Sequence, residues 1–167
     1  VQTGFSAGTV TLTDGSITGT ADKFSEGTFS LAGSKKLTMG AGTFGGAAID
    51  GAGLVDFNGA ITLSGSTITN TGVNTITASN TLTLGGAATL TNITNSGTLA
   101  LAGNVLTING ATASSIGGTI TAASNGGITV NGASTALTWD PSVQTGFSAG
   151  TVTLTDGSIT GTADKFS

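Results

Sequence analysis

The sequence predicts an all-β chain, and specifically a β-solenoid with coils of roughly 20 to 24 residues. A 25-residue segment recurs letter for letter, so the chain is repetitive. A weaker period of about twenty residues runs between the two copies. Short segments alternate apolar and polar residues, as half-buried strands do, while apolar residues never group at helical spacing. We expect a right-handed parallel β-helix.

The long repeat defines the expected domain organisation. Residues 1–25, VQTGFSAGTVTLTDGSITGTADKFS, return unchanged as residues 143–167. We expect residues 1–142 to be one unit of a tandem array and residues 143–167 to begin the next, identical unit. Because the sequence opens on Val1 rather than Met, we interpret it as an excerpt of a longer protein.

A shorter outline recurs inside this unit, with two short strands flanking a polar or glycine turn. It begins at Gly8, Gly27, Gly53, Asn74, Gly97, Gly118 and Gly150. The last interval, from Gly118 to Gly150, is the longest and could contain one more turn. The unit is therefore expected to hold six or seven coils, and at about 4.8 Å per coil it would advance about 29 to 34 Å.

Alternation identifies the strands and the core. In residues 9–13, Val10 and Leu12 fall on one face and three Thr on the other. Residues 81–84, 98–101, 106–108 and 128–130 repeat the pattern. Branched side chains suit the pleated surface of a strand. The predicted core residues, whose role is coil stacking, are Val10, Leu12, Leu63, Leu82, Leu84, Leu99, Leu101, Leu106, Ile108, Ile128 and Val130.

A tandem array of β-sandwich domains is the alternative fold. A sandwich needs two broad apolar faces, usually with bulky aromatic residues between them. This chain has one Trp and seven Phe, which we place mostly outside the regular strands. A solenoid needs only a thin core, because each coil rests on the next. The composition therefore favours the solenoid.

The composition also excludes several kinds of chemistry. The chain has no His, no Cys and no Arg, and only 7% of its residues are charged. Imidazole and thiolate metal sites, Ser-His-Asp nucleophiles and disulfides are thereby excluded. Four lysines are too few for a nucleic-acid footprint, and no apolar run is long enough for a transmembrane helix. We expect no catalytic residues, no cofactor and no enzymatic activity.

Three motifs could still carry chemistry. Residues 40–45 match G-x-G-x-x-G, but no helical pattern follows them, so we expect a glycine-rich turn rather than a dinucleotide site. Asp50 and Asp56 are the weak candidates for a calcium site, since a calcium β-roll would repeat its motif and this one does not. The main charged cluster consists of Asp22, Lys23, Glu26, Lys35 and Lys36. It could supply the carboxylate pair of a polysaccharide-acting enzyme, but a solvated loop is favoured.

T-x-T runs suggest a different role. They place hydroxyl groups on one face of a strand and occur at residues 9–13, 67–71, 75–77, 81–83, 89–91 and 119–121. If successive coils align these groups, the surface resembles the threonine arrays of ice-binding β-solenoids. The unequal coil lengths argue against a flat array of this kind, and Thr is also simply a favoured outward residue of strands.

Two segments carry a resemblance to a known class of protein. Residues 97–110, GTLALAGNVLTING, and residues 74–92, NTITASNTLTLGGAATLTN, resemble the β-helical repeats of filamentous-haemagglutinin-type adhesins, autotransporter passengers and giant repetitive exoproteins of bacteria. The resemblance implies an extracellular or cell-surface location and a role in display, adhesion or matrix building. It assigns no functional residue.

The distribution of charge suggests the partners. Residues 57–139 contain no charged side chain, and such a surface tends to associate because soluble monomers rely on charge to stay apart. We therefore expect a structural fibre segment whose partners are copies of itself, end to end or side by side, and surface glycans or neighbouring cells. Ice binding and a polysaccharide-acting enzyme are the alternative functions.

Overall fold

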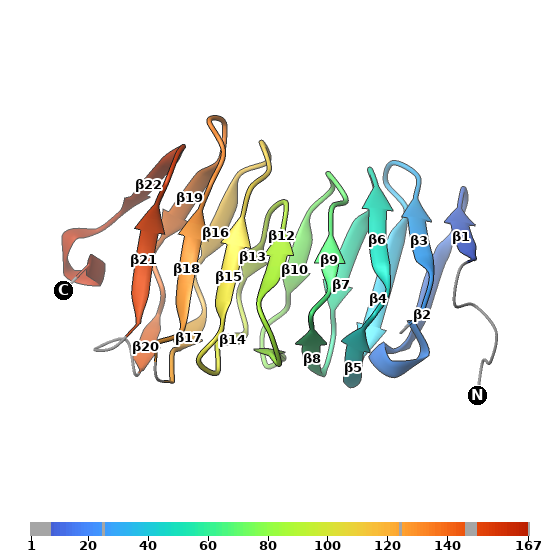
Figure 1. Ribbon diagram of the computed structural model, residues 1–167, viewed down its shortest axis with the longest axis horizontal. Helices are drawn as coiled ribbons and strands as arrows, with labels where there is room; N and C mark the ends of the chain where they lie inside the picture. Colours follow the sequence, from blue (N-terminus) through green and yellow to red (C-terminus); the bar gives the residue numbers. More distant parts are fainter. Residues whose placement is uncertain (1–7, 25, 124, 146–149, 167) are drawn as a thin grey trace.

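The computed structural model, which describes residues 8–24, 26–123, 125–145 and 150–166, is a β-solenoid. Its strands form three sheets in which all pairs are parallel, and the coils stack along the long axis of the molecule (Figure 1). The predicted all-β solenoid is therefore confirmed. About seven coils of roughly twenty residues separate β1 from β22, at opposite ends of the stack.

Sheets A and B each contain eight strands. Sheet A comprises β1 (Thr9–Leu12), β3 (Thr28–Leu31), β6 (Ala48–Gly51), β9 (Thr67–Ile68), β12 (Ala88–Leu90), β15 (Val105–Ile108), β18 (Gly127–Val130) and β21 (Thr151–Leu154). Sheet B comprises β2 (Ser16–Thr20), β4 (Lys36–Gly40), β7 (Leu54–Phe57), β10 (Asn74–Ile76), β13 (Thr94–Asn95), β16 (Ser114–Ile116), β19 (Ala136–Trp139) and β22 (Ser158–Gly161).

Sheet C has six strands: β5 (Gly42–Gly45), β8 (Ala60–Ser64), β11 (Thr81–Leu84), β14 (Thr98–Ala100), β17 (Thr119–Thr121) and β20 (Val143–Thr145). In the first coil, the short 3-10 helix η1 (Ala21–Phe24) follows sheet B and contacts β5. In the last coil, the corresponding helix η2 (Ala163–Phe166) follows β22. Each complete coil thus passes through sheets A, B and C in turn.

The two-strand outline expected for each coil was wrong, because a complete coil has three strands. The segment from Gly8 covers sheets A and B, the segment from Gly53 covers B and C, and the segment from Gly97 covers C and then A. The two strands of the outline therefore belong to different pairs of sheets in different coils, and for this reason the spacing of the outline along the sequence is irregular. In the structure, the positions aligned with Thr9 in sheet A follow at more even intervals; they are Thr28, Ala48, Thr67, Thr89, Thr107, Thr129 and Thr153.

The core is a continuous apolar column inside the coils. Ten of the eleven residues expected to stack there are at most 8% exposed, from Leu12 to Val130. Val10 is only partly buried, because β1 has a neighbouring strand on one side alone among the described residues. The burial of these apolar side chains is the main favourable contribution to folding, at roughly 1.5 to 3 kcal/mol per large aliphatic side chain.

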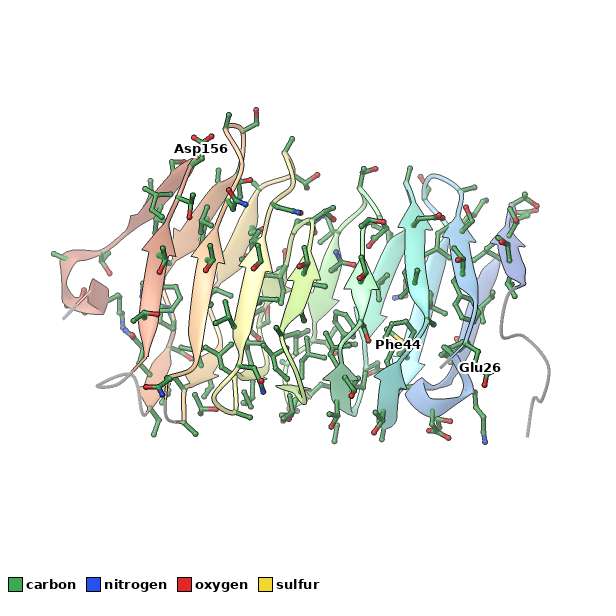
Figure 2. The ribbon with its side chains drawn as sticks, in the orientation of Figure 1. Glu26, Phe44 and Asp156 are labelled. Carbon is green, nitrogen blue, oxygen red and sulfur yellow. The ribbon has the colours of Figure 1, made fainter. Side chains whose placement is uncertain are left out.

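Aromatic residues contribute more to the core than their placement outside the regular strands predicted. Phe29, Phe44, Phe57 and Trp139 all lie in strands and are buried. Figure 2 shows the Phe44 side chain within the space that the strands surround, whereas Glu26 and Asp156 lie at its periphery. The core is therefore thin but includes large rings, concentrated in the coils near the N-terminal end and at Trp139.

Candidate functional site

The outer face of sheet A carries a column of threonines. Seven of the eight aligned positions are Thr, and Ala48 is the exception. These side chains are exposed or half-buried, since they point away from the core. The column stays aligned although the coils differ in length, because the extra residues lie in the corners between sheets. Unequal coil lengths therefore do not disrupt the alignment of this column.

Sheet C carries two parallel columns of outward side chains. One contains Thr43, Thr62, Thr83, Ala100, Thr121 and Thr145. The other contains Ala60, Thr81, Thr98, Thr119 and Val143. Side chains in neighbouring columns lie two residues apart on a strand, about 6.6 Å, and neighbouring coils are about 4.8 Å apart. The two columns thus present a regular grid of hydroxyl and methyl groups without a charged side chain.

The T-x-T runs do not all belong to one face. Residues 81–83 and 119–121 lie in sheet C, and Thr75 lies in sheet B. Residues 9–11, Thr67 and Thr89 lie in sheet A. The outer column of sheet B mixes residue types, because Asp56 and Ser115 align with its threonines. Sheet C differs from both other sheets in that its two outer columns contain only small uncharged residues, mostly threonines, whereas Asp50 and Asp56 lie in the outer columns of sheets A and B.

Charged side chains gather in the first three coils. The Lys35 Nζ lies 2.9 Å from the Asp14 Oδ1, and the Lys36 Nζ lies 3.0 Å from the Asp56 Oδ2. The hydrogen bond from Lys35 lowers the pKa of the Asp14 carboxyl below its usual value, and the backbone N–H of Gly15 adds to the effect. Each pair joins side chains of two successive coils. The charged cluster expected to form a solvated loop therefore also contributes ion pairs between coils.

Asp22 and Lys23 form a separate pair within η1, with Nζ and Oδ2 3.5 Å apart. A backbone N–H hydrogen bond at Asp22 is the main cause that lowers the pKa of its carboxyl, and the Thr20 hydroxyl and the Lys23 charge act in the same direction. Both side chains of the pair are about half exposed. The geometry is that of a surface ion pair, which contributes little to stability.

The weak calcium candidates are not brought together into a ligand set. Asp50 lies on β6 in sheet A, whereas Asp56 lies on β7 in sheet B, where Lys36 pairs with it. Within the described parts of the chain, no three His, Cys, Asp or Glu residues form a group that could hold a metal ion. Calcium prefers six to eight oxygen ligands, so these two carboxylates alone do not make a site.

The G-x-G-x-x-G motif is not the turn that the sequence predicted. Its residues 42–45 form strand β5, which pairs with β8 in sheet C. No helix follows the motif, since β6 comes next. A dinucleotide site would need a helix N-terminus at this position to bind the pyrophosphate. The motif is therefore part of the solenoid wall.

A cluster of buried asparagines, which the sequence pattern did not indicate, lies where the coils turn between sheets A and B. Asn70, Asn74 and Asn92 are fully buried. The Asn92 Oδ1 accepts a hydrogen bond from the backbone N–H of Asn74 at 2.9 Å, and the Asn92 amide donates to the Gly72 carbonyl at 2.8 Å. These amides thus satisfy backbone groups of the adjacent coil. The only sequence signal was the density of Asn in residues 70–95.

The two ends of the solenoid consist of identical sequence. The first coil (β1, β2 and η1) and the last coil (β21, β22 and η2) form the same elements from the two copies of the repeat. β21 pairs with β18, and β22 pairs with β19, so the second copy continues sheets A and B without a break. The Trp139 indole N–H and the Gln144 amide each donate to the Lys165 carbonyl at 2.9 Å.

Comparisons of the chain with protein-family models, with curated proteins and with solved structures found no match. Among the described residues, no helix is long and apolar enough to cross a membrane. The features that bear on function are therefore the threonine columns, the uncharged middle coils and the repeated end coils.

Proposed function

We propose that this chain is a structural segment of a repetitive fibre, a stalk or filament that acts in adhesion or assembly and has no catalytic role. One observation supports this most strongly. The second copy of the repeat begins with β20, which completes the seventh coil in sheet C, and continues with β21 and β22, which extend sheets A and B. A further unit of the same sequence can then follow in the same way, so the length of the fibre is set by the number of units.

The direction of the hydrogen bonds fits a mechanical role. In parallel sheets stacked as coils, the backbone hydrogen bonds between strands run along the long axis. A pull along that axis is therefore shared by three ladders, in sheets A, B and C. The uncharged middle coils add no electrostatic repulsion between neighbouring fibres, which favours lateral association.

The length of tandem arrays tests the fibre proposal. Chains with one, two and three copies of the unit 1–142 should form rods that lengthen by about 34 Å per unit, for seven coils of about 4.8 Å each. Small-angle scattering gives the rod length, and electron microscopy gives the shape. Arrays that collapse into globules, or that lengthen without a constant increment, would contradict the proposal.

A location outside a bacterial cell is part of the same proposal and rests on the resemblance to β-helical surface proteins. Surface glycans and neighbouring cells are the partners this location would offer. An antibody against the middle coils should label intact cells. Labelling that requires cell lysis would argue against surface display, and hydrolysis or cleavage of a polysaccharide by the folded segment would argue against a purely structural role.

Ice binding is the second candidate, and the grid on sheet C favours it. Its two columns present threonines from six successive coils. Thr83→Lys would place a long charged side chain in the middle of this grid, whereas Thr107→Lys would alter sheet A alone. If sheet C binds ice, thermal hysteresis should be lost in the first variant and kept in the second. A parent chain without hysteresis removes this candidate.

A further inference from the structure

Two turns of identical sequence lie next to each other where the strands of sheet A end. Residues 109–111 and 131–133 both read Asn-Gly-Ala, and they directly follow the paired strands β15 and β18. The backbone N–H of each asparagine donates to a carbonyl of the preceding coil, at 3.2 Å for Asn109 and 2.9 Å for Asn131. Both asparagines are exposed, and both turns have a coil on either side. The two turns can therefore be compared directly.

The two turns differ at the glycine. The Gly110 N–H donates to the Thr91 carbonyl at 2.8 Å, so this glycine still belongs to the hydrogen-bond ladder between coils. At Gly132 the backbone leaves the ladder, because its φ is +145°, a value that side chains other than glycine rarely allow. The Gly132 N–H has no hydrogen-bond acceptor among the described residues. The backbone nitrogen is therefore occupied in the first turn and available in the second.

We propose that Asn131 and Gly132 form a self-modifying site, at which the asparagine is converted into aspartate and isoaspartate. The Gly132 nitrogen loses its proton and attacks Cγ of Asn131. A C–N bond forms, the bond from Cγ to Nδ2 breaks, and the amide nitrogen takes up a proton and leaves as ammonia. Solvent water then opens the cyclic imide, at Cγ to give aspartate or at the backbone carbonyl carbon to give isoaspartate. The reaction needs no reactant besides water, and it goes beyond the proposed fibre function.

The position of the glycine nitrogen decides how fast this reaction proceeds. The two reacting atoms belong to adjacent residues, so their encounter costs little entropy. A glycine in the second position has no Cβ to hinder the approach. An N–H that donates to a carbonyl must first break that hydrogen bond, which slows the attack by about tenfold. This penalty applies to Gly110, whose partner is the Thr91 carbonyl, and not to Gly132.

The remaining Asn-Gly pairs of the sequence are restrained in other ways. The Asn58 Oδ1 accepts a hydrogen bond from the Asn80 amide at 3.1 Å, which holds the side chain that would have to rotate toward Gly59. Gly126, which follows Asn125, is buried and therefore shielded from solvent water. Asn131 thus combines an exposed amide with an available glycine nitrogen.

The modification would change the charge of the middle coils. Residues 57–139 contain no charged side chain, so a carboxylate at position 131 would be the first in this stretch. Position 131 is exposed, and the new charge would therefore lie at the surface. Fibres that associate through uncharged coils would repel one another more strongly as the product accumulates. This consequence rests on the proposed fibre function, whereas the reaction itself does not.

Incubation of the full chain at mildly alkaline pH tests the proposal, with Asn109 as the matched internal control. Mass spectrometry of peptic peptides measures the conversion at each site, and fragmentation distinguishes aspartate from isoaspartate. In the folded chain, Asn131 should convert about tenfold faster than Asn109. In the chain unfolded by urea, the two rates should be similar, because the same residues follow both asparagines. Asn131→Gln should remove most of the ammonia that the folded chain releases.

Two results would overturn the proposal. Equal rates at the two sites in the folded chain, or a faster reaction at Asn109, would show that the hydrogen bond of Gly110 does not decide reactivity. An Asn131 that stays intact in the folded chain, over a time in which it converts fully in the unfolded chain, would show that the fold protects this site. Neither result would affect the fibre proposal, because the rod length of tandem arrays is measured separately.

Discussion

Leu84 offers a quantitative test of the coil-stacking core. It is fully buried in β11 and faces Leu63 of the preceding coil. The adjacent Thr83 points outward and is half-buried. Leu84→Ala removes buried methyl groups and leaves a cavity, which typically costs about 2 to 5 kcal/mol. Thr83→Ala removes only a strand preference, which spans about 1 kcal/mol at most. Positions 83 and 84 are adjacent in the chain, so the two variants differ mainly in whether the altered side chain points outward or into the core.

Urea unfolding followed by far-ultraviolet circular dichroism measures both variants. A domain with about 5 to 15 kcal/mol of stability should show a clearly lower midpoint for Leu84→Ala and a nearly unchanged one for Thr83→Ala. Lysine at the two positions sharpens the contrast: Leu84→Lys should prevent folding, because it buries an unpaired charge, whereas Thr83→Lys should fold. Equal losses for the two positions would refute the assignment of inward and outward faces.

Two further substitutions test contacts between coils. Asp14→Asn removes the charged partner of Lys35. Because the pKa of Asp14 is lowered in the folded state, the stabilisation by its carboxylate is present above about pH 4 and is lost as the pH falls through the pKa of the folded state. The free energy of unfolding of the variant should therefore depend less on pH in this window. Asp156→Asn is the matched control, since Asp156 caps the same turn in the last coil and forms no ion pair among the described residues. An equal change in the pH dependence of stability in this control would contradict the role of Lys35. Asn92→Ala should lower stability by a few kcal/mol, because it leaves the buried backbone N–H of Asn74 without an acceptor, and a midpoint in urea equal to that of the parent would contradict this.

Local alternation was enough to predict the fold, because it reports which side chains point inward. The strands expected at residues 81–84, 106–108 and 128–130 correspond to β11, β15 and β18. Strands without a clear alternation were harder to predict, and β5 is an example. Gly42–Gly45 has little intrinsic strand preference, yet it forms β5 because β8 provides hydrogen-bond partners on the next coil. Neighbouring coils thus impose strand structure that the residues alone do not encode.

The candidate surfaces were only partly predictable for the same reason. The T-x-T pairs are visible in the sequence, but the sheet that each pair joins depends on how many residues the intervening corners contain. The buried asparagines were missed because Asn is usually exposed. Asn92 is buried nevertheless, since its side chain bonds to backbone groups of the adjacent coil. Such pairings are long-range and become visible only once the coils are aligned.

Diffraction from oriented fibres of a tandem array tests the central claim most directly. If coils stack along the fibre, a strong reflection at about 4.8 Å should lie on the fibre axis, with a longer axial repeat of about 34 Å from seven coils per unit. A 4.8 Å reflection perpendicular to the axis would contradict the account, because the strands would then run along the fibre.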